Sequence, residues 1–254
     1  MNRLFASLIL MLALIMNADF GLAQAQEQEQ PPPLPVRIGV FVGGLYSMHS
    51  GGFHFPESTE APITAYDEGT AFGPSFGIRF DLPLLRNLRL SPRLFAECRR
   101  GDFTSDPFTM EIIGQDLQPQ SMTLEDDLEV TMRMAGIDLM LQWSPFGTGP
   151  YLLAGPTVGM KLYEEFRVTE RIVEPALVTF LDGSRSKEMY DDDPEFTRDL
   201  TLGLRAGVGY TLALNRDMAL GVEAQYLMLL QPVREDGDWS MAGLQATVAL
   251  LFAL

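Results

Sequence analysis

The chain has 254 residues and a formal net charge of −16, because its 34 Asp and Glu residues far outnumber its 18 Lys and Arg residues. This acidity argues against nucleic-acid binding, since a phosphate backbone binds basic surfaces, and a hydrophobic content of 46% excludes a disordered chain. The single cysteine, Cys98, excludes an internal disulfide framework, a four-cysteine zinc site and a CxxC redox pair.

The N-terminal segment, residues 1–25, has the layout of a secretory signal peptide. Arg3 precedes the apolar run LFASLILMLALIM, and AQA supplies small residues before a cleavage point after Ala25. The run is shorter than the about 20 apolar residues of a membrane-spanning helix, and Asn17 interrupts the apolar stretch. We therefore expect an exported protein whose mature chain begins with a proline-rich periplasmic segment at 26–35.

Beyond this segment apolar and polar residues alternate with a period of two, which is typical of strands whose two faces meet different surroundings. We expect eight strands, at VRIGVFVGGLY, AFGPSFGIRFDL, LRLSPRLFAEC, EVTMRMAGIDLMLQW, YLLAGPTVGMKLY, LTLGLRAGVGYTLAL, MALGVEAQYLM and GLQATVALLFAL. In the fourth of these strands the apolar parity switches between Met134 and Ile137. We interpret this switch as a β-bulge around 135–136.

Short and long connections alternate between the expected strands. PLLRN, SPFGTG and NRD are short turns, whereas long segments lie near 49–69, 101–126 and 164–196, with a shorter one near 231–238. This alternation places the long loops together at one end of an up-and-down meander. Most acidic residues fall in these loops, in stretches such as TLEDDLE, YEEF and YDDDPE.

Two all-β architectures fit this pattern. A soluble periplasmic, lipocalin-like binder turns its apolar faces inward around a ligand, whereas a transmembrane barrel turns them outward to lipid. The polar faces here hold Gly, Thr and single charges rather than the dense Lys and Glu of solvated strands. We therefore predict an all-β fold over 36–254, an eight-stranded antiparallel up-and-down transmembrane β-barrel. Aromatic residues near the expected strand ends fit interfacial girdles: Tyr46, Trp143, Tyr151, Tyr163, Tyr226, Trp239 and Phe252.

The stretches FGPSFGIRFDLPL, LRLSPRLFAE, GPYLLAGPTVG, LGLRAGVGY and VEAQYLM resemble the Gram-negative outer-membrane β-barrel domain family, of the eight-stranded OmpA/PorT-like kind. The resemblance covers about 36–254. It implies insertion by the barrel-assembly machinery, chain termini in the periplasm and long loops outside the cell. Family members usually end on an aromatic residue, whereas this chain ends on Leu254 with Phe252 two residues earlier. We also expect no periplasmic domain after the last strand.

Charged residues on the polar faces are the candidate site, because they would point into the barrel. Eight strands leave an interior just wide enough for side chains, so we expect a structural network of paired charges that fills the lumen. A narrow ion path closed by the same pairs is the alternative. The PLLRN turn would bring Asp81 opposite Arg89 or nearly so, with Arg79 and Arg93 close by on the same face. The NRD turn would set Arg205 diagonal to Glu223. The expected network comprises Arg79, Asp81, Arg89, Arg93, Glu97, Asp138, Arg205 and Glu223.

Two further patterns leave other chemistry open. His49 and His54 flank SGGF in the first long segment with Ser50 beside them, which is the combination that a lipid-modifying barrel enzyme would use. YDDDPE and EDGD offer carboxylates to calcium but lack the EF-hand spacing.

We predict a non-enzymatic outer-membrane protein with a structural, adhesive or partner-binding role through acidic extracellular loops, and with no catalytic residue, cofactor or metal. A component of an envelope secretion or transport machinery is one alternative, and a lipid-modifying enzyme is another. The expected partners are outer-membrane lipid, the barrel-assembly machinery during insertion, and an extracellular or envelope protein, with no nucleic acid.

Overall fold

The structure is a computed structural model. It describes residues 35–54, 65–113, 119–146, 149–192, 197–234 and 238–254. The signal peptide expected at 1–25 therefore lies outside the described residues, as does the proline-rich segment up to residue 34. Within the described residues there is no helix of sufficient length and apolarity to cross a membrane.

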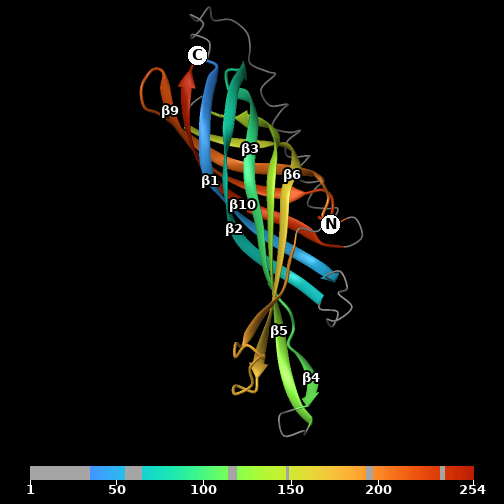
Figure 1. The fold of residues 1–254 in the computed structure, drawn as a ribbon. Helices are drawn as coiled ribbons and strands as arrows, with labels where there is room; N and C mark the ends of the chain where they lie inside the picture. The colour runs from blue at the N-terminus through green and yellow to red at the C-terminus, as the bar shows by residue number, and fades with distance from the viewer. Residues whose placement is uncertain (1–34, 55–64, 114–118, 147–148, 193–196, 235–237) are drawn as a thin grey trace, which may run out of the picture. The chain divides into compact units, whose positions relative to one another are not determined.

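One antiparallel sheet contains all ten strands of the described residues (Figure 1). They are β1 (Arg37–His54), β2 (Ala65–Leu85), β3 (Leu88–Thr104), β4 (Phe108–Ile113), β5 (Pro119–Trp143), β6 (Gly149–Glu174), β7 (Ser186–Asp192), β8 (Leu200–Ala213), β9 (Met218–Leu229) and β10 (Ser240–Ala253). Eight of them close into a ring in the order β1-β2-β3-β5-β6-β8-β9-β10. The predicted eight-stranded antiparallel barrel is confirmed. The short strands β4 and β7 are additional, and they pair with β5 and β6 respectively.

The C-terminal strand completes the ring. In the β1–β10 pair the register runs from Arg37 with Ala253 to Ser50 with Ser240, without a shift. On its other side β10 pairs with β9. Both edges of the apolar C-terminal strand are thereby hydrogen-bonded, and no row of backbone polar groups is left facing lipid.

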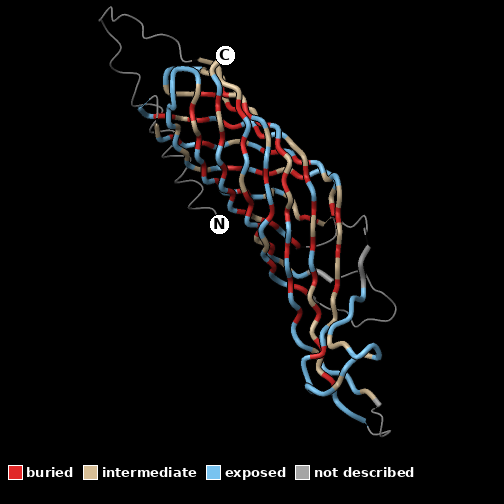
Figure 2. The backbone as a smooth tube through the Cα atoms, turned by 60° about the vertical axis from the view of Figure 1, so that its left-hand side comes forward, coloured by how far each residue is buried: buried red, intermediate tan, exposed pale blue. Residues whose placement is uncertain are grey.

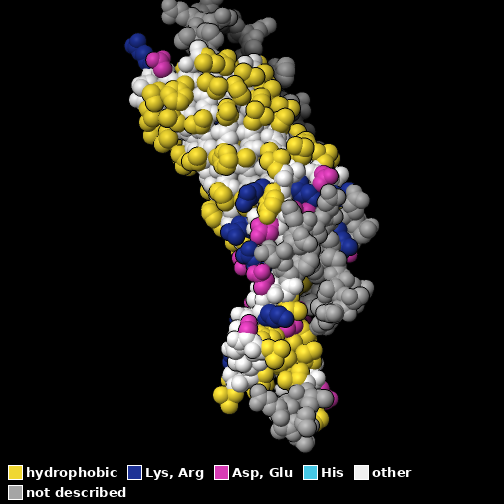
Figure 3. All heavy atoms as spheres, in the orientation of Figure 1, with side chains coloured by type: hydrophobic (Ala, Val, Ile, Leu, Met, Phe, Trp, Pro, Cys, Tyr) yellow, Lys and Arg dark blue, Asp and Glu magenta, His cyan; other side chains and the backbone are white. Residues whose placement is uncertain are grey.

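Buried and exposed residues alternate along the barrel strands (Figure 2). Val208 and Val248 point outward and are 55% and 46% exposed, whereas Gln245 and Thr247 point inward and are buried. The outward apolar side chains form a belt around the end of the barrel that holds the C-terminus (Figure 3). Apolar faces outside and polar faces inside are the transmembrane arrangement, opposite to that of a soluble ligand-binding barrel.

Several strands run further than their sequence patterns predict. β5 and β6 contain 25 and 26 residues, more than twice the about 9 to 11 that span a bilayer. The segments expected as loops near 49–69, 101–126 and 164–196 accordingly contain strand residues, including all of β4 and β7. The rest of those segments falls partly outside the described residues.

The apolar pattern of β5 inverts although its backbone stays regular. Inward positions continue from Met122 to Gln142, and the register with β3 has no shift. Met134 and Asp138 thus face the same interior, while Ile137 is exposed. The bulge predicted at 135–136 is wrong, because the parity switch marks where the medium outside the strand changes from lipid to water.

The bulge lies on the neighbouring strand instead. Arg133 pairs with Tyr163 of β6 and Met134 pairs with Lys161, so Leu162 is one residue too many. This extra residue flips the faces of β6. Before it, the inward residues have odd numbers, such as Leu153, and after it they have even numbers, such as Phe166.

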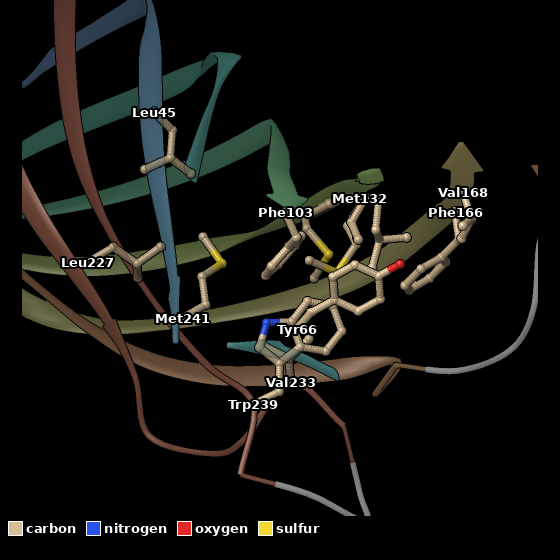
Figure 4. Close-up of a cluster of buried hydrophobic side chains, with 13 residues drawn as sticks. Leu45, Tyr66, Phe103, Met132, Phe166, Val168, Leu227, Val233, Trp239 and Met241 are labelled. Carbon is tan, nitrogen blue, oxygen red and sulfur yellow. The ribbon is translucent and has the colours of Figure 1, made fainter. Parts of the chain in front are cut away.

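Beyond the belt, the barrel encloses an apolar core rather than a polar lumen (Figure 4). Tyr66, Phe103, Phe166 and Trp239, here called the aromatic cluster, point toward one another, with ring centroids 6.0 Å apart for Phe103 and Trp239. Val233 packs with them and donates its backbone N–H to the Trp239 carbonyl at 2.7 Å. The connection predicted as an exposed loop near 231–238 therefore sends residues on both flanks into the barrel.

Candidate functional site

The membrane-spanning half of the lumen holds a cluster of buried ion pairs centred on Glu223. Its carboxylate accepts from Arg79 Nη1 at 2.5 Å and from Arg93 Nη1 at 2.7 Å. The Tyr151 hydroxyl donates to it at 2.6 Å and the Gln225 amide at 2.7 Å. All five side chains are buried. One carboxylate thus connects β9 with β2, β3 and β6.

A second centre forms around Glu97, further along the lumen. Arg205 Nη2 lies 2.7 Å from one carboxylate oxygen of Glu97, and Arg99 Nε lies 2.9 Å from the other. Arg205 also reaches Asp138, with Nε 3.1 Å from Oδ1, and its guanidinium lies 4.8 Å from the centroid of the Phe95 ring. The two acids therefore share one arginine between β3, β5 and β8.

All eight charged residues predicted for the lumen are buried there, and seven of them take part in ion pairs. The exception is Arg89, which forms no ion pair with a described residue. The β2–β3 register sets Asp81 opposite Ser91, whose hydroxyl donates to it at 2.8 Å, and places Arg89 in the neighbouring diagonal position, close to where it was expected. The predicted diagonal pairing of Arg205 with Glu223 is wrong. The β8–β9 register sets Arg205 too far from Glu223 for a diagonal contact, and each finds partners on other strands.

Three members of these centres, Arg99, Tyr151 and Gln225, lay outside the predicted network. Arg99 continues the polar parity of Glu97, and this signal was available in the sequence, but the strand was expected to end at Cys98. Tyr151 was assigned to the interfacial girdle, yet it is buried and bonded to Glu223. Trp239 was misassigned in the same way, because an aromatic residue near a strand end can face either side.

His49 closes the aromatic cluster from β1. Trp239 Nε1 donates to its Nδ1 at 3.1 Å, and its Nε2 lies 2.9 Å from the Arg100 carbonyl. This pattern requires a neutral ring with the proton on Nε2. His49 lies beyond the belt, whose last exposed bulky residue on β1 is Tyr46. Burial lowers its pKa to about 4, and the Arg99 charge acts in the same direction.

The enzyme alternative depended on His49, His54 and Ser50. His49 points into the barrel with both ring nitrogens engaged, whereas Ser50 is exposed and lies 3.0 Å from the Ser240 hydroxyl. The two side chains face opposite sides of β1 and do not form a nucleophile–base pair. The side chain of His54 lies outside the described residues, as do most of YDDDPE and EDGD.

Beyond the barrel, β4 and β7 flank the outer ends of β5 and β6 (Figure 1). β4, β7, these outer ends and the segment between β6 and β7 are here called the strand extension. Met122, Leu124 and Ile172 form its small core. β4 and β7 are the two ends of the sheet, so among the described strands each has a free edge. Both edge strands expose an apolar side chain, Met110 at 39% and Met189 at 44%.

One known protein family matches most of the chain. The family described as "Outer membrane protein beta-barrel domain" matches residues 23–233. Among solved structures, the chain is similar to Ail, the attachment invasion locus protein of Yersinia pestis, with 8% identity, 86% of this chain and 100% of that one covered, and a TM-score of 0.33. It is also similar to Neisserial surface protein A, with 11% identity, 84% of this chain and 96% of that one covered, and a TM-score of 0.34. For the outer membrane protease OmpT of Escherichia coli the identity is 10%, 91% of this chain and 100% of that one are covered, and the TM-score is 0.35. No curated protein matches the chain in sequence. The chain belongs to the outer-membrane β-barrel domain family of Gram-negative bacteria, and its location is the cell outer membrane.

Proposed function

We propose that the protein is a non-enzymatic barrel that holds the strand extension outside the cell as a binding arm for a protein partner. The observation that carries the proposal is the length of β5 and β6, which continue well past the belt and acquire β4 and β7 there. A barrel needs no such strands to cross the membrane. Loops and strands that are positioned by a rigid scaffold commonly carry function.

The filled lumen supports display over transport. Ion pairs occupy its membrane-spanning half and the aromatic cluster occupies the half beyond the belt. Opening a path would require buried charges to lose their partners, which is strongly unfavourable. The outer surface of the strand extension therefore supports a function better than the interior does.

The free edges favour a partner that adds a strand. An edge strand presents unpaired N–H and C=O groups, and proteins that do not use such edges usually protect them with charge, proline or a covering segment. Here Met110 and Met189 are exposed on β4 and β7, and Leu177 and Leu181 are fully exposed between β6 and β7. An extended segment of a partner would gain backbone hydrogen bonds and cover these side chains.

The first test concerns which side of the membrane carries the strand extension. In a Cys98→Ser background, Leu177→Cys in the strand extension and Arg216→Cys in the β8–β9 turn would be treated with a membrane-impermeant maleimide on intact cells. We expect labelling of Leu177→Cys, and labelling of Arg216→Cys only after permeabilisation. The reverse pattern would contradict the proposed orientation.

The second test concerns the edge itself. A photo-crosslinking residue at Met110 is expected to give a discrete adduct with one protein on intact cells, whereas the same residue at lipid-facing Val158 is not. Replacing Ser105–Asp126 by an Asn-Gly turn between the paired residues Thr104 and Asp127 removes β4 together with the outer end of β5, Pro119–Asp126. A photo-crosslinking residue at Met189 on β7 tests the other edge in the same way. The edge role is wrong if neither Met110 nor Met189 gives an adduct while the barrel is folded.

A further inference from the structure

A groove of about 560 Å³ lies on the outer surface of β2, β3, β5 and β6, at the level where the apolar belt ends. On the belt side it is lined by apolar side chains, including Phe76, Ala96 and Leu162. On the other side it is lined by charged ones, and Figure 3 shows charged side chains gathered directly beyond the belt. The groove therefore meets hydrocarbon and water at once.

Two arginines form the charged wall nearest the belt. Arg133 of β5 pairs with Cys98 of β3, and Arg100 pairs with Thr131, so the arginines occupy diagonal positions on adjacent strands, about 7 to 8 Å apart at the backbone. Both are exposed, and neither forms an ion pair with a described residue. The guanidinium of Arg133 lies 4.9 Å from the centroid of the Tyr163 ring, which fixes its direction.

The outward acids of the groove already have a cationic partner. Arg167 lies 3.1 Å from Glu165 and 3.8 Å from Glu129. The Tyr163 hydroxyl also donates to Glu165, at 3.2 Å. The two acids lie farther from the belt than Arg133, because they pair along the next rows of the sheet. Arg100 and Arg133 are thus left beside the apolar lining without an ion pair to a described residue, although three acidic residues balance the three arginines in the whole lining.

We propose that this groove binds a phosphorylated glycolipid of the outer leaflet, with Arg100 and Arg133 on its phosphate and an acyl chain along Phe76 and Leu162. Arginine forms charge-assisted hydrogen bonds with phosphate oxygens, and a phosphate at the belt edge lies at headgroup depth. The volume exceeds what a free phosphate ion fills. The proposal depends on the orientation proposed above, which the Leu177→Cys labelling tests separately.

The test uses the full-length protein purified in a zwitterionic detergent, with native mass spectrometry to count bound lipid. The probe is a bis-phosphorylated lipid A, compared with its dephosphorylated form. We expect the double variant Arg100→Gln/Arg133→Gln to bind the phosphorylated probe at least about tenfold more weakly than the wild type. Arg171→Gln is the matched control, because Arg171 is an outward arginine paired with Glu125 at 3.0 Å outside the groove. It should bind as the wild type does.

Three results would overturn the proposal. The first is equal binding by the double variant, and the second is equal binding of the dephosphorylated lipid, which would leave an apolar groove without phosphate recognition. The third is displacement of the probe by millimolar inorganic phosphate, which would assign the arginines to a free anion. A heat-dependent shift in SDS electrophoresis, the same in all variants, shows that the barrel is folded in each. If labelling confirms the orientation and lipid binding fails, the glycolipid site alone is wrong.

Discussion

At the scale of single residues, Glu223 shows how an acidic side chain can be held inside a membrane protein. It lies between two guanidiniums and a phenol from three other strands, and none of the groups is exposed. Removing one partner from such an arrangement leaves an uncompensated buried charge, which is more damaging than the absence of the whole set. The stability of the barrel therefore depends strongly on this carboxylate.

We expect Glu223→Gln to lower the free energy of unfolding by about 3 to 5 kcal/mol, because Arg79 and Arg93 lose their shared counter-charge. The measurement is urea unfolding of the protein in lipid vesicles, followed by tryptophan fluorescence. Glu188→Gln is the control, since Glu188 is half exposed and its contact with Arg167 is 3.7 Å; its effect should stay below about 1 kcal/mol. Equal losses of unfolding free energy in the two variants would show that the buried ion pairs of the lumen contribute no more to stability than an exposed ion pair does.

His49 makes stability dependent on pH. Its pKa is lowered to about 4 in the folded state from 6.5, so between these values the unfolded state binds the proton and the folded state does not. Stability that is present above pH 6.5 is then lost as the pH falls toward 4, by about 3 kcal/mol in total.

The check is the midpoint of urea unfolding from pH 7.5 to pH 4.5 for the wild type and for His49→Gln. Acidic residues titrate in both proteins, so the difference between the two curves reports His49. We expect the wild type to lose more stability than the variant over this window. Parallel curves would mean that His49 is protonated in the folded state or that its site opens.

At the scale of elements, β5 and β6 each pass through two media. Their outward residues are apolar along the belt and mostly charged or polar beyond it. On β5 the inward residues become more apolar beyond the belt, whereas β6 buries apolar side chains in both parts, Leu153 within the belt and Phe166 beyond it. β5 makes the change on a regular backbone, and β6 makes it across the extra residue Leu162. The change in the outward residues of β5 and β6 thus marks the boundary between lipid and water.

This boundary predicts that an arginine substitution destabilises the barrel at one outward position of β6 and is tolerated at another. Val158 of β6 faces outward within the belt, and we expect Val158→Arg to lower the free energy of unfolding by about 2 to 4 kcal/mol. Thr169 faces outward beyond the belt and pairs with Asp127 and Glu188. Thr169→Arg should therefore change the free energy of unfolding by less than about 1 kcal/mol. Unfolding in vesicles measures both. Comparable losses would place the membrane boundary elsewhere.

Strand existence and facing were predictable from the sequence, because a period of two depends only on local geometry. Strand length was not, since beyond the belt the alternation continues in the opposite sense and resembles an irregular loop or a bulge, as at Met134 and Ile137. Pairing across the lumen was not predictable either. Parity shows that Arg205 points inward, but only the closed ring shows that it meets Glu97 rather than Glu223.

At the scale of the whole molecule, the interior consists of two layers with different chemistry. In the part surrounded by lipid, the ion-pair centres of Glu223 and Glu97 lie beside two small apolar clusters, which contain Phe95 and Leu153. The aromatic cluster with His49 lies in the part beyond it. Side chains of both layers point into the lumen. This arrangement is the basis for proposing that the exposed surface, rather than the interior, meets other molecules.

We therefore expect no steady ion conductance from the wild-type protein in a planar lipid bilayer. The physical reason is that both layers would have to open together, with loss of buried ion pairs in one and of apolar packing in the other. Insertion is verified by the faster migration of unheated protein in SDS. Regular current steps of constant size from folded protein would contradict a filled lumen and favour the narrow ion path.

The apolar core beyond the belt also has a mechanical consequence. Residues of this core come from β1, β2, β3, β5, β6, β9, β10 and the segment between β9 and β10, so the core can form only when all these parts lie together on the same side of the membrane. Once formed, it cannot return without dispersing its aromatic rings and drawing the charged outer rows of β5 and β6 through hydrocarbon. The core beyond the belt therefore anchors the barrel across the membrane, because the outer end of the folded barrel cannot pass back through the bilayer.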